Sequence, residues 1–169
     1  VAAAAAIARA CDARAESIKS AIRAFKLDRH RIEFVANRDG VLWFDDSKAT
    51  NPHAADASLK SFESVIWIVG GLLKGADIND LVSQNASRLK AAVVIGVDQT
   101  EVLEALSDHA PGVKVIRVAA DADNPMGEAV RFANAEAEPG DVVLLAPAAA
   151  SMDHKRQSFK NCKVECTLG

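Results

Sequence analysis

Apolar residues change their spacing along this chain of 169 residues. Near the amino end they recur at helical intervals, first in an alanine-rich run at 2–8 and then from Arg14 to Phe25. In the second segment Ile18, Ile22 and Phe25 share one face. Beyond residue 30 the apolar residues gather instead in short runs. The pattern therefore predicts a helical pair followed by a different architecture.

The first two short runs predict a β-hairpin. They span 32–35 and 41–44, and the sequence Asn37-Arg38-Asp39-Gly40 separates them. An Asp-Gly pair between two such runs is typical of the tight turn that joins antiparallel strands.

The later runs predict strands that alternate with helices. The apolar runs at 65–69 and 141–145 are typical of strands covered on both faces, and two further strands are predicted at 91–95 and 113–118. Helical patterns fall near 52–61, 78–88, 100–108 and 125–137. Short links between alternating strands and helices indicate right-handed crossovers. We predict an α/β fold: a Rossmann-like, doubly wound and mainly parallel sheet with helices on both faces, preceded by two helices.

The first of those two helices is apolar on every side. A helix of that kind must be buried against something, so we expect residues 1–29 to end a preceding domain that the chain does not include. Residues 30–169 then form the domain that contains the sheet. We see no low-complexity linker and no internal repeat between these parts.

Composition narrows the classes of partner. Half of the residues are hydrophobic, and the net charge is -3 without a basic patch, which argues against a nucleic-acid partner. No apolar run approaches the length of a membrane span. The three cysteines, Cys11, Cys162 and Cys166, lack paired metal-ligand spacing, so we expect free thiols in a reducing compartment. We expect a cytoplasmic protein that binds no metal by itself.

Three predicted turns that follow strands carry unusual chemistry. The first, 45–53, holds two acids, two hydroxyls, a lysine and an amide, and either Thr50 or Asn51 is expected to cap the next helix. The second, 70–75, has two glycines that let the backbone approach a ligand, followed by Lys74. The third, 146–153, places Ser151 at a predicted helix cap. Taken singly, the second turn is equally consistent with a plain loop, and a serine in the position of Ser151 is more often only a cap.

The position of these turns is more informative than any one of them. All three lie at carboxyl ends of strands, so they can converge on one crevice, which is where ligands bind in open α/β sheets. Lys48 and Lys74 make that crevice positive, which suits a phosphate or a carboxylate.

Four strings occur in order along the chain: His30-Arg31-x-Glu33, Asp46-Ser47-Lys48-Ala49-Thr50-Asn51, Gly70-Gly71-x-x-Lys74 and Leu144-Leu145-x-Pro147-Ala148-x-Ala150-Ser151-x-Asp153. Together they make the chain resemble the Mur ligases. The resemblance covers residues 1 to about 153 and is closest to the members that add D-glutamate. The second string is specific within the family, whereas Gly-Gly-x-x-Lys means little by itself.

This resemblance implies an ATP-dependent, amide-bond-forming ligase of peptidoglycan synthesis. ATP, with Mg²⁺, would convert the carboxylate of UDP-N-acetylmuramoyl-L-alanine to an acyl phosphate, which the amine of D-glutamate attacks. Residues 1–29 would end the central ATPase domain of the family, and 30–169 would form its C-terminal amino-acid-binding domain.

The resemblance also implies roles for single residues. Thr50, Lys74 and Ser151 would hold the carboxylates of D-glutamate. Lys48 would be catalytic, near the transferred phosphate, while Arg31 and Asp46 would face the nucleoside of ATP. We assign no site role to His30, which is interpreted as a residue that helps only to fix the hinge between domains.

Two departures from the family affect what the chain can do alone. It has no G-x-x-x-x-G-K-[ST] loop to cradle phosphates, so we expect an inactive ligase on its own, and a monomer. The tail, 154–169, is atypical for the family, and its nearest aromatic candidate for a substrate contact is Phe159. Two alternatives stay open: another amino-acid ligase, similar to folylpolyglutamate synthase, or a non-catalytic Rossmann-like binding module.

Overall fold

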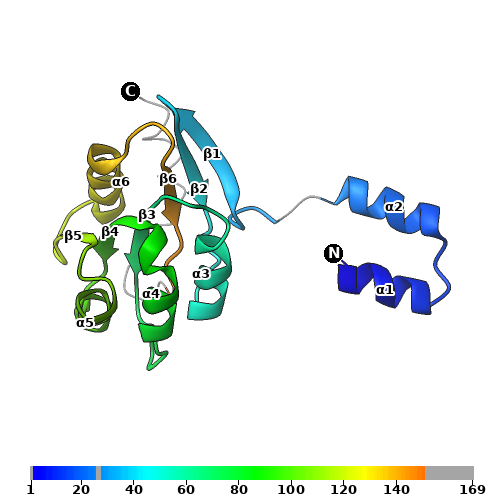
Figure 1. Ribbon diagram of the computed structural model, residues 1–169, viewed down its shortest axis with the longest axis horizontal. Helices are drawn as coiled ribbons and strands as arrows, with labels where there is room; N and C mark the ends of the chain where they lie inside the picture. The colour runs from blue at the N-terminus through cyan, green and yellow to red at the C-terminus, as the bar shows by residue number, and fades with distance from the viewer. Residues whose placement is uncertain (1, 26–27, 151–169) are drawn as a thin grey trace.

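The computed structural model describes residues 2–25 and 28–150 of the chain. Figure 1 shows a helical pair to one side of a body in which helices flank a single sheet. The helices are α1 (Ala2–Ala10), α2 (Ala15–Ala24), α3 (Pro52–Leu59), α4 (Asn79–Asn85), the 3₁₀ turn η1 (Ala86–Arg88), α5 (Thr100–His109) and α6 (Pro125–Glu136). The strands are β1 (Glu33–Arg38), β2 (Val41–Asp45), β3 (Val65–Gly70), β4 (Leu89–Ile95), β5 (Lys114–Arg117) and β6 (Val142–Leu145).

The order of the strands places the last one in the middle of the sheet. The six strands run β1-β2-β6-β3-β4-β5, and only β1 is antiparallel to its neighbour. The chain fills one half from β3 to β5, then returns through α6 and inserts β6 between β2 and β3. The loops that follow β2, β6 and β3 therefore lie next to one another at one edge of the sheet.

The predicted hairpin is confirmed, together with its tight Asp-Gly turn. Arg38 pairs with Val41, so only Asp39 and Gly40 form the connection. Both have left-handed backbone, with φ of +51° and +84°, which is the conformation that two-residue hairpins require. Residues 37–38, which lie between the two predicted runs, belong to β1.

Two cores cover the two faces of the sheet. On one face α3, α4 and α5 pack against alternate strand residues such as Trp67, Val69 and Leu144. On the other, α6 packs against the residues between them, such as Ile66 and Ile68. All six residues of β3 are buried, as its continuous apolar run predicts. The predicted doubly wound α/β fold is confirmed.

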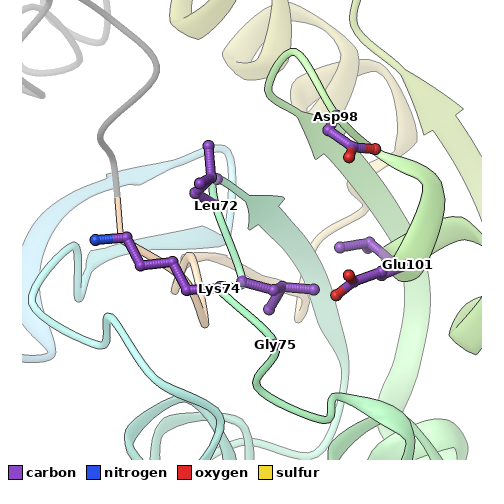
Figure 2. A pocket seen from close by; sticks show the side chains of 8 residues that line it. Leu72, Lys74, Gly75, Asp98 and Glu101 are labelled. Atoms are coloured by element: carbon purple, nitrogen blue, oxygen red, sulfur yellow. The ribbon is translucent and has the colours of Figure 1, made fainter.

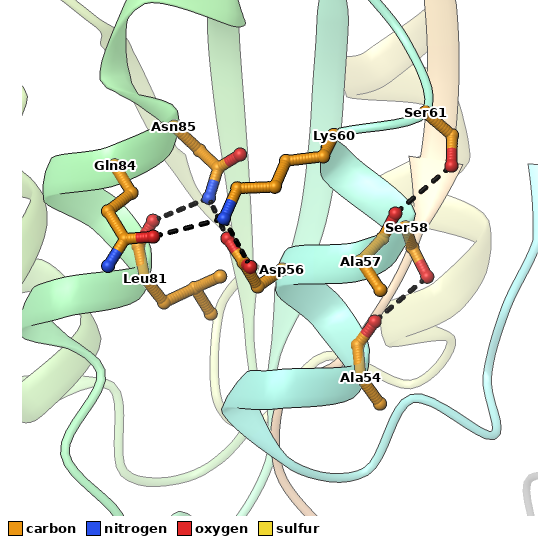
Figure 3. Close-up of polar contacts among 9 residues, drawn as sticks. All are labelled: Ala54, Asp56, Ala57, Ser58, Lys60, Ser61, Leu81, Gln84 and Asn85. Atoms are coloured by element: carbon orange, nitrogen blue, oxygen red, sulfur yellow. Dashed lines mark hydrogen bonds and ion pairs between the residues drawn. The ribbon is translucent and has the colours of Figure 1, made fainter.

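A polar network joins α3 to α4 on the outer side of the first core (Figure 3). The side-chain amide of Asn85 donates to Asp56 at 2.8 Å and to the carbonyl of Leu81 at 2.9 Å. Lys60 bridges Asp56, at 2.6 Å, and Gln84, at 3.0 Å. Burial opposes ionisation of Asp56, but the bonds from Lys60 and Asn85 lower its pKa. The network fixes α3, the helix that begins directly after the 45–51 turn.

A second network closes the amino ends of the central strands. Lys90, at the start of β4, reaches both Glu138 and Asp141 at 2.6 Å. Asp141, directly before β6, also accepts from Ser64, directly before β3, at 2.7 Å. Three strands that are distant in sequence are therefore joined at one buried carboxylate.

The helical pair α1–α2 contributes nothing to these cores. Neither helix has a buried residue, and Ile7 and Phe25 are 66% and 63% exposed. Figure 1 shows the pair beyond β1, away from the helices that cover the sheet. Among the helices of the described residues, none combines the length and the apolar character needed to cross a membrane.

Candidate functional site

The loops at the carboxyl ends of β2, β6 and β3 are joined by backbone hydrogen bonds. The N–H of Asp46 donates to Leu145 at 2.8 Å, and that of Ala148 donates to Ala49 at 2.9 Å. These two bonds tie the loop after β6 to the loop after β2. The turns that the sequence predicts to converge are therefore in direct contact.

The loop after β6 is tied equally firmly to the loop after β3. Leu72 and Ala150 form an isolated antiparallel bridge, with N–H···O distances of 3.0 and 3.3 Å. Beneath it, the buried indole of Trp67 donates to the carbonyl of Ala146 at 2.8 Å. A side chain of the core thus holds the start of the loop after β6 in place.

The glycines at the end of β3, Gly70 and Gly71, make room for protein backbone. A Cβ on Gly70 would lie 1.9 Å from the carbonyl oxygen of Ile95, and one on Gly71 would lie 3.0 Å from that of Ala150. Both glycines have positive φ, which L side chains rarely adopt. Within the described chain Gly70 thus lies against the end of β4 and Gly71 against the loop after β6, and approach of these glycines to a ligand stays a prediction.

Lys74 lies at the tip of this tightly held loop. It is exposed, has a left-handed φ of +53° and has no hydrogen-bond or ion-pair partner within residues 2–25 and 28–150. It lines a cavity of about 220 Å³ together with Asp98 and Glu101, which approach from the start of α5. Figure 2 shows its ammonium directed away from these two carboxylates. The lysine is therefore available to an anion on the side of the loop after β6.

The turn that carries Lys48 and Thr50 is held by groups beneath it. Asp45 accepts from the N–H of Ser47 at 2.9 Å, and the buried Asp46 accepts from the hydroxyl of Ser58 in α3. Asn51 caps α3 by accepting from the N–H of Ala54 at 3.0 Å. Of the two candidate caps, Asn51 fills the role, so the hydroxyl of Thr50 is left exposed for another partner.

Two residues expected near ATP share one carboxylate. Asp28 lies 3.6 Å from Nε of Arg31 and 3.6 Å from Nζ of Lys48. All three side chains are largely exposed, so each pair contributes little to stability. Asp28 nevertheless brings the two cations to the same side of the turn.

Several expected residues lie outside the described part of the chain. Ser151 is one of them, although its neighbour Ala150 is held against Leu72. Phe159, Cys162 and Cys166 are also outside it. Cys11, within the described residues, is an exposed free thiol, as expected.

One polar cluster was not assigned to the site from sequence. His30 Nδ1 lies 2.7 Å from Asp45 Oδ2, and the backbone N–H of His30 donates to Glu33 at 2.8 Å. The candidate ligand atoms of the three side chains lie within 4.8 Å of one another. Two members belong to the string His30-Arg31-x-Glu33, which was the available signal, but Asp45 joins them only through the pairing of β1 with β2.

The fold is shared with solved structures of low sequence identity. A pseudomurein peptide ligase type C from Methanothermus fervidus superposes with a TM-score of 0.66 at 18% identity, over 85% of this chain and 31% of that one. MurF from Acinetobacter baumannii gives 0.52 at 21% identity, over 82% and 31%. At these identities the likeness concerns the fold alone.

Sequence relatives are much closer. The UDP-N-acetylmuramoylalanine--D-glutamate ligase of Leifsonia xyli is 53% identical over 152 residues, which are 89% of this chain and 29% of that protein. The enzyme of the same name from Thermobifida fusca is 53% identical over 151 residues, 89% of this chain and 32% of that protein. The chain thus spans about a third of the length of these relatives.

The match to a family model covers the body that contains the sheet. The model described as "Mur ligase, glutamate ligase domain" matches residues 30–149, from the cluster at His30 through all three loops of the candidate site. The expected resemblance is confirmed: this chain belongs to the glutamate ligase domain family of the Mur ligases.

Proposed function

We propose that this chain is the amino-acid-binding part of an ATP-dependent ligase that joins D-glutamate to UDP-N-acetylmuramoyl-L-alanine in peptidoglycan synthesis. The observation that carries the proposal is the junction of three loops at one sheet edge, which presents Lys74 and Thr50 to solvent on rigid backbone. The names of the relatives at about half identity support this substrate.

In this proposal each exposed group has a simple task. Lys74 and Thr50, with Ser151, hold the two carboxylates of D-glutamate, since an ammonium and hydroxyls are strong donors to carboxylate oxygens. Lys48 acts as the catalytic residue by neutralising the phosphate that leaves when the amine attacks the acyl phosphate. Arg31, which shares Asp28 with Lys48, lies on the same side as that phosphate and faces the nucleoside.

Asp46 faces the nucleoside with one carboxylate oxygen. Ser58 holds Oδ2, and Oδ1 makes no hydrogen bond to any other described residue. An acid held in this way can accept from a ribose hydroxyl without changing its rotamer. Burial of Asp46 then serves to orient the carboxylate.

ATP supplies the phosphoryl group, and Mg²⁺ would neutralise the negative charge of its phosphates. Among the described residues, the group with ligand spacing is His30, Glu33 and Asp45, whose donors and acceptors already bond to one another. We therefore assign Mg²⁺ to the rest of the ligase. The residues of this chain bind and orient the amino acid and neutralise phosphate.

We further propose that residues 1–29 end the central ATPase domain and that 30–169 form the C-terminal domain. Two observations support this boundary: α1 and α2 leave an apolar groove exposed, lined by Ala4, Ala8, Ile18, Ile22 and Phe25 among others, and the family match begins at residue 30. Because the chain has no G-x-x-x-x-G-K-[ST] loop, it supplies one wall of the site and does not turn over alone. The proposed ligase is monomeric and cytoplasmic.

Titration of the isotope-labelled chain with D- and L-glutamate, followed by NMR, tests the substrate. We expect shifts centred on Lys74 and Thr50 with D-glutamate, and a Kd of roughly millimolar because few contacts are made without the other substrates. Lys74→Ala keeps the same left-handed strain and removes the ammonium, so it weakens binding about tenfold or more. Lys114→Ala, at an exposed lysine of β5, is the matched control and changes nothing.

The same titration separates the proposal from its alternatives. Preferential binding of L-glutamate would favour an enzyme similar to folylpolyglutamate synthase and contradict ours. Equal shifts for both enantiomers, or shifts remote from residues 50 and 74, would remove this edge of the sheet as the amino-acid site.

A further inference from the structure

We propose that His30 is a positioning residue which, together with Asp45 and Glu33, clasps the segment 28–32 onto the turn that carries Lys48. The proposal rests on the function proposed above for Lys48. It assigns to His30 a task in the reaction without contact to any substrate. We call the three side chains the His30 clasp.

The imidazole of His30 reaches the base of the Lys48 turn through one carboxylate. Its Nδ1 bonds to Asp45 Oδ2 at 2.7 Å, and Asp45 Oδ1 accepts from the N–H of Ser47 at 2.9 Å. Asp45 is only 5% exposed. Because a buried carboxylate requires hydrogen-bond partners, it holds His30, from the segment 28–32, and Ser47, from the turn that carries Lys48.

The backbone of the segment makes a second, parallel connection. The carbonyl of His30 accepts from the N–H of Lys48 at 3.2 Å. The N–H of His30 is turned the other way, to Glu33 at the start of β1. His30 therefore bonds at the same time to β1, to the end of β2 and to the turn that carries Lys48.

The local conformation shows that these bonds determine the path of the chain. His30 and Ile32 both have left-handed backbone, with φ of +65° and +44°. Histidine tolerates that region, but for a β-branched residue such as isoleucine it is a genuine outlier. A strained conformation persists only where the surroundings hold it, and the clasp supplies bonds on both sides of residue 31.

The consequence is a mechanical link between the linker and the phosphate side of the site. Any displacement of residues 28–32 must either break the bonds of His30 or carry the Lys48 turn with it. Arg31 and Asp28 lie in the same segment. The clasp thus keeps the groups assigned to ATP in register with the loop that carries Thr50.

Amide hydrogen exchange on the chain tests the clasp directly. In His30→Gly, which accepts left-handed backbone but lacks the imidazole, we expect exchange at the amides of Ser47 and Lys48 to rise about tenfold or more. His30→Asn tolerates the same φ and places an amide nitrogen where Nδ1 was, so exchange stays near the parent rate. Amides of β3 and β4 are unchanged in both variants. His109→Ala, at an exposed histidine of α5, is the control.

Kinetics of the full-length ligase that carries this domain test the positioning role. We expect His30→Gly to lower kcat about tenfold or more while KM for D-glutamate changes less than about threefold, since the contacts of Lys74 are untouched. His30→Asn recovers most of kcat. A merely destabilised protein would also lower the apparent kcat through loss of folded enzyme, so kcat is calculated per folded enzyme; a parental kcat on that basis would leave only a structural role for His30.

The possible failures are distinct. Unchanged amide exchange at Ser47 and Lys48 in His30→Gly overturns the clasp. The clasp is also overturned if Zn²⁺ protects these two amides in the parent and no longer protects them in His30→Gly, because the cluster would then be a metal site. Faster exchange with parental kcat overturns the positioning role. Full activity of Lys48→Ala contradicts the proposed function of Lys48 and leaves the exchange result standing.

Discussion

The two ends of the parallel strands use charge in opposite ways. At the amino ends, Lys90 is bonded to two carboxylates, and Asp141 also accepts from Ser64. At the carboxyl ends, Lys74 has no partner within the described residues, and Lys48 has only a long ion pair with the exposed Asp28. Both ends are held by backbone hydrogen bonds, but among the described residues only the amino ends have the lysine side chain bonded to carboxylates. The amino ends therefore use their charges for stability, whereas the carboxyl ends leave lysines exposed, as the proposed binding of an anion requires.

At the carboxyl ends, the close packing of Gly70 against β4 should be the feature most sensitive to substitution. Gly70→Ala places a methyl group against the carbonyl of Ile95 in a conformation that alanine rarely adopts, so we expect a loss of about 3 kcal/mol or more in the free energy of unfolding. Gly75→Ala, five residues on in the same loop, meets nothing within 4 Å and should cost only about 1–2 kcal/mol for its positive φ. Urea denaturation of both variants measures the difference. Equal losses would mean that the contact with β4 does not hold the loop.

The amino ends should respond next most strongly. Asp141→Ala leaves the partly buried ammonium of Lys90 with only the exposed Glu138 and removes the acceptor of Ser64. We expect destabilisation of about 2–3 kcal/mol. Lys74→Ala, at the other end, should change stability by less than about 0.5 kcal/mol while it weakens D-glutamate binding. If Lys74→Ala were as destabilising as Asp141→Ala, the division between the two ends would be wrong.

Thr50 and Asn51, adjacent in one turn, should differ in the same way as the two ends of the sheet. Asn51→Ala removes the cap of α3 and should cost about 1 kcal/mol. Thr50→Val preserves the shape of an exposed side chain and removes only its hydroxyl, so stability should be unchanged within about 0.5 kcal/mol. Thermal denaturation gives the first result, and titration with D-glutamate should show weaker binding in Thr50→Val alone. A stability loss in Thr50→Val would indicate that its hydroxyl serves the fold.

The smallest effect is the dependence of stability on pH at the amino ends. Burial opposes ionisation of Asp141, but bonds from Lys90, Ser64 and the N–H of Glu138 outweigh it and lower its pKa. Its contribution is therefore present above the unfolded-state pKa and is lost as pH falls through the lower folded pKa. The bonds of Lys90 to Asp141 and Glu138 raise the pKa of the lysine from 10.5, so its contribution is lost only as pH rises through that higher value.

Urea denaturation across this pH range checks both limbs. Asp141→Asn should flatten the acid limb, and Lys90→Met should flatten the alkaline limb. Parental slopes in either variant would show that the network does not titrate on unfolding.

Local patterns determined most of the elements of this protein. Each strand of the sheet and each helix follows a run or a helical spacing that is visible in the sequence, and Asp39-Gly40 marks the hairpin turn. Boundaries moved by only a few residues, as where β4 begins at Leu89 instead of residue 91. The string around Lys48 also indicated the family, because a specific string of residues can be recognised without knowledge of the fold.

Tertiary structure alone decided how these parts meet. No local signal places β6 between β2 and β3, because strand order is set by long-range pairing and by packing on two faces. Nor does a local signal explain why residue 70 is glycine, because the group that leaves no room for a side chain there is a carbonyl of β4, 25 positions away. The choice of Asn51 over Thr50 as a cap and the meeting of His30 with Asp45 depend likewise on backbone geometry. Side-chain periodicity is a property of neighbours in sequence, whereas a site is made by neighbours in space.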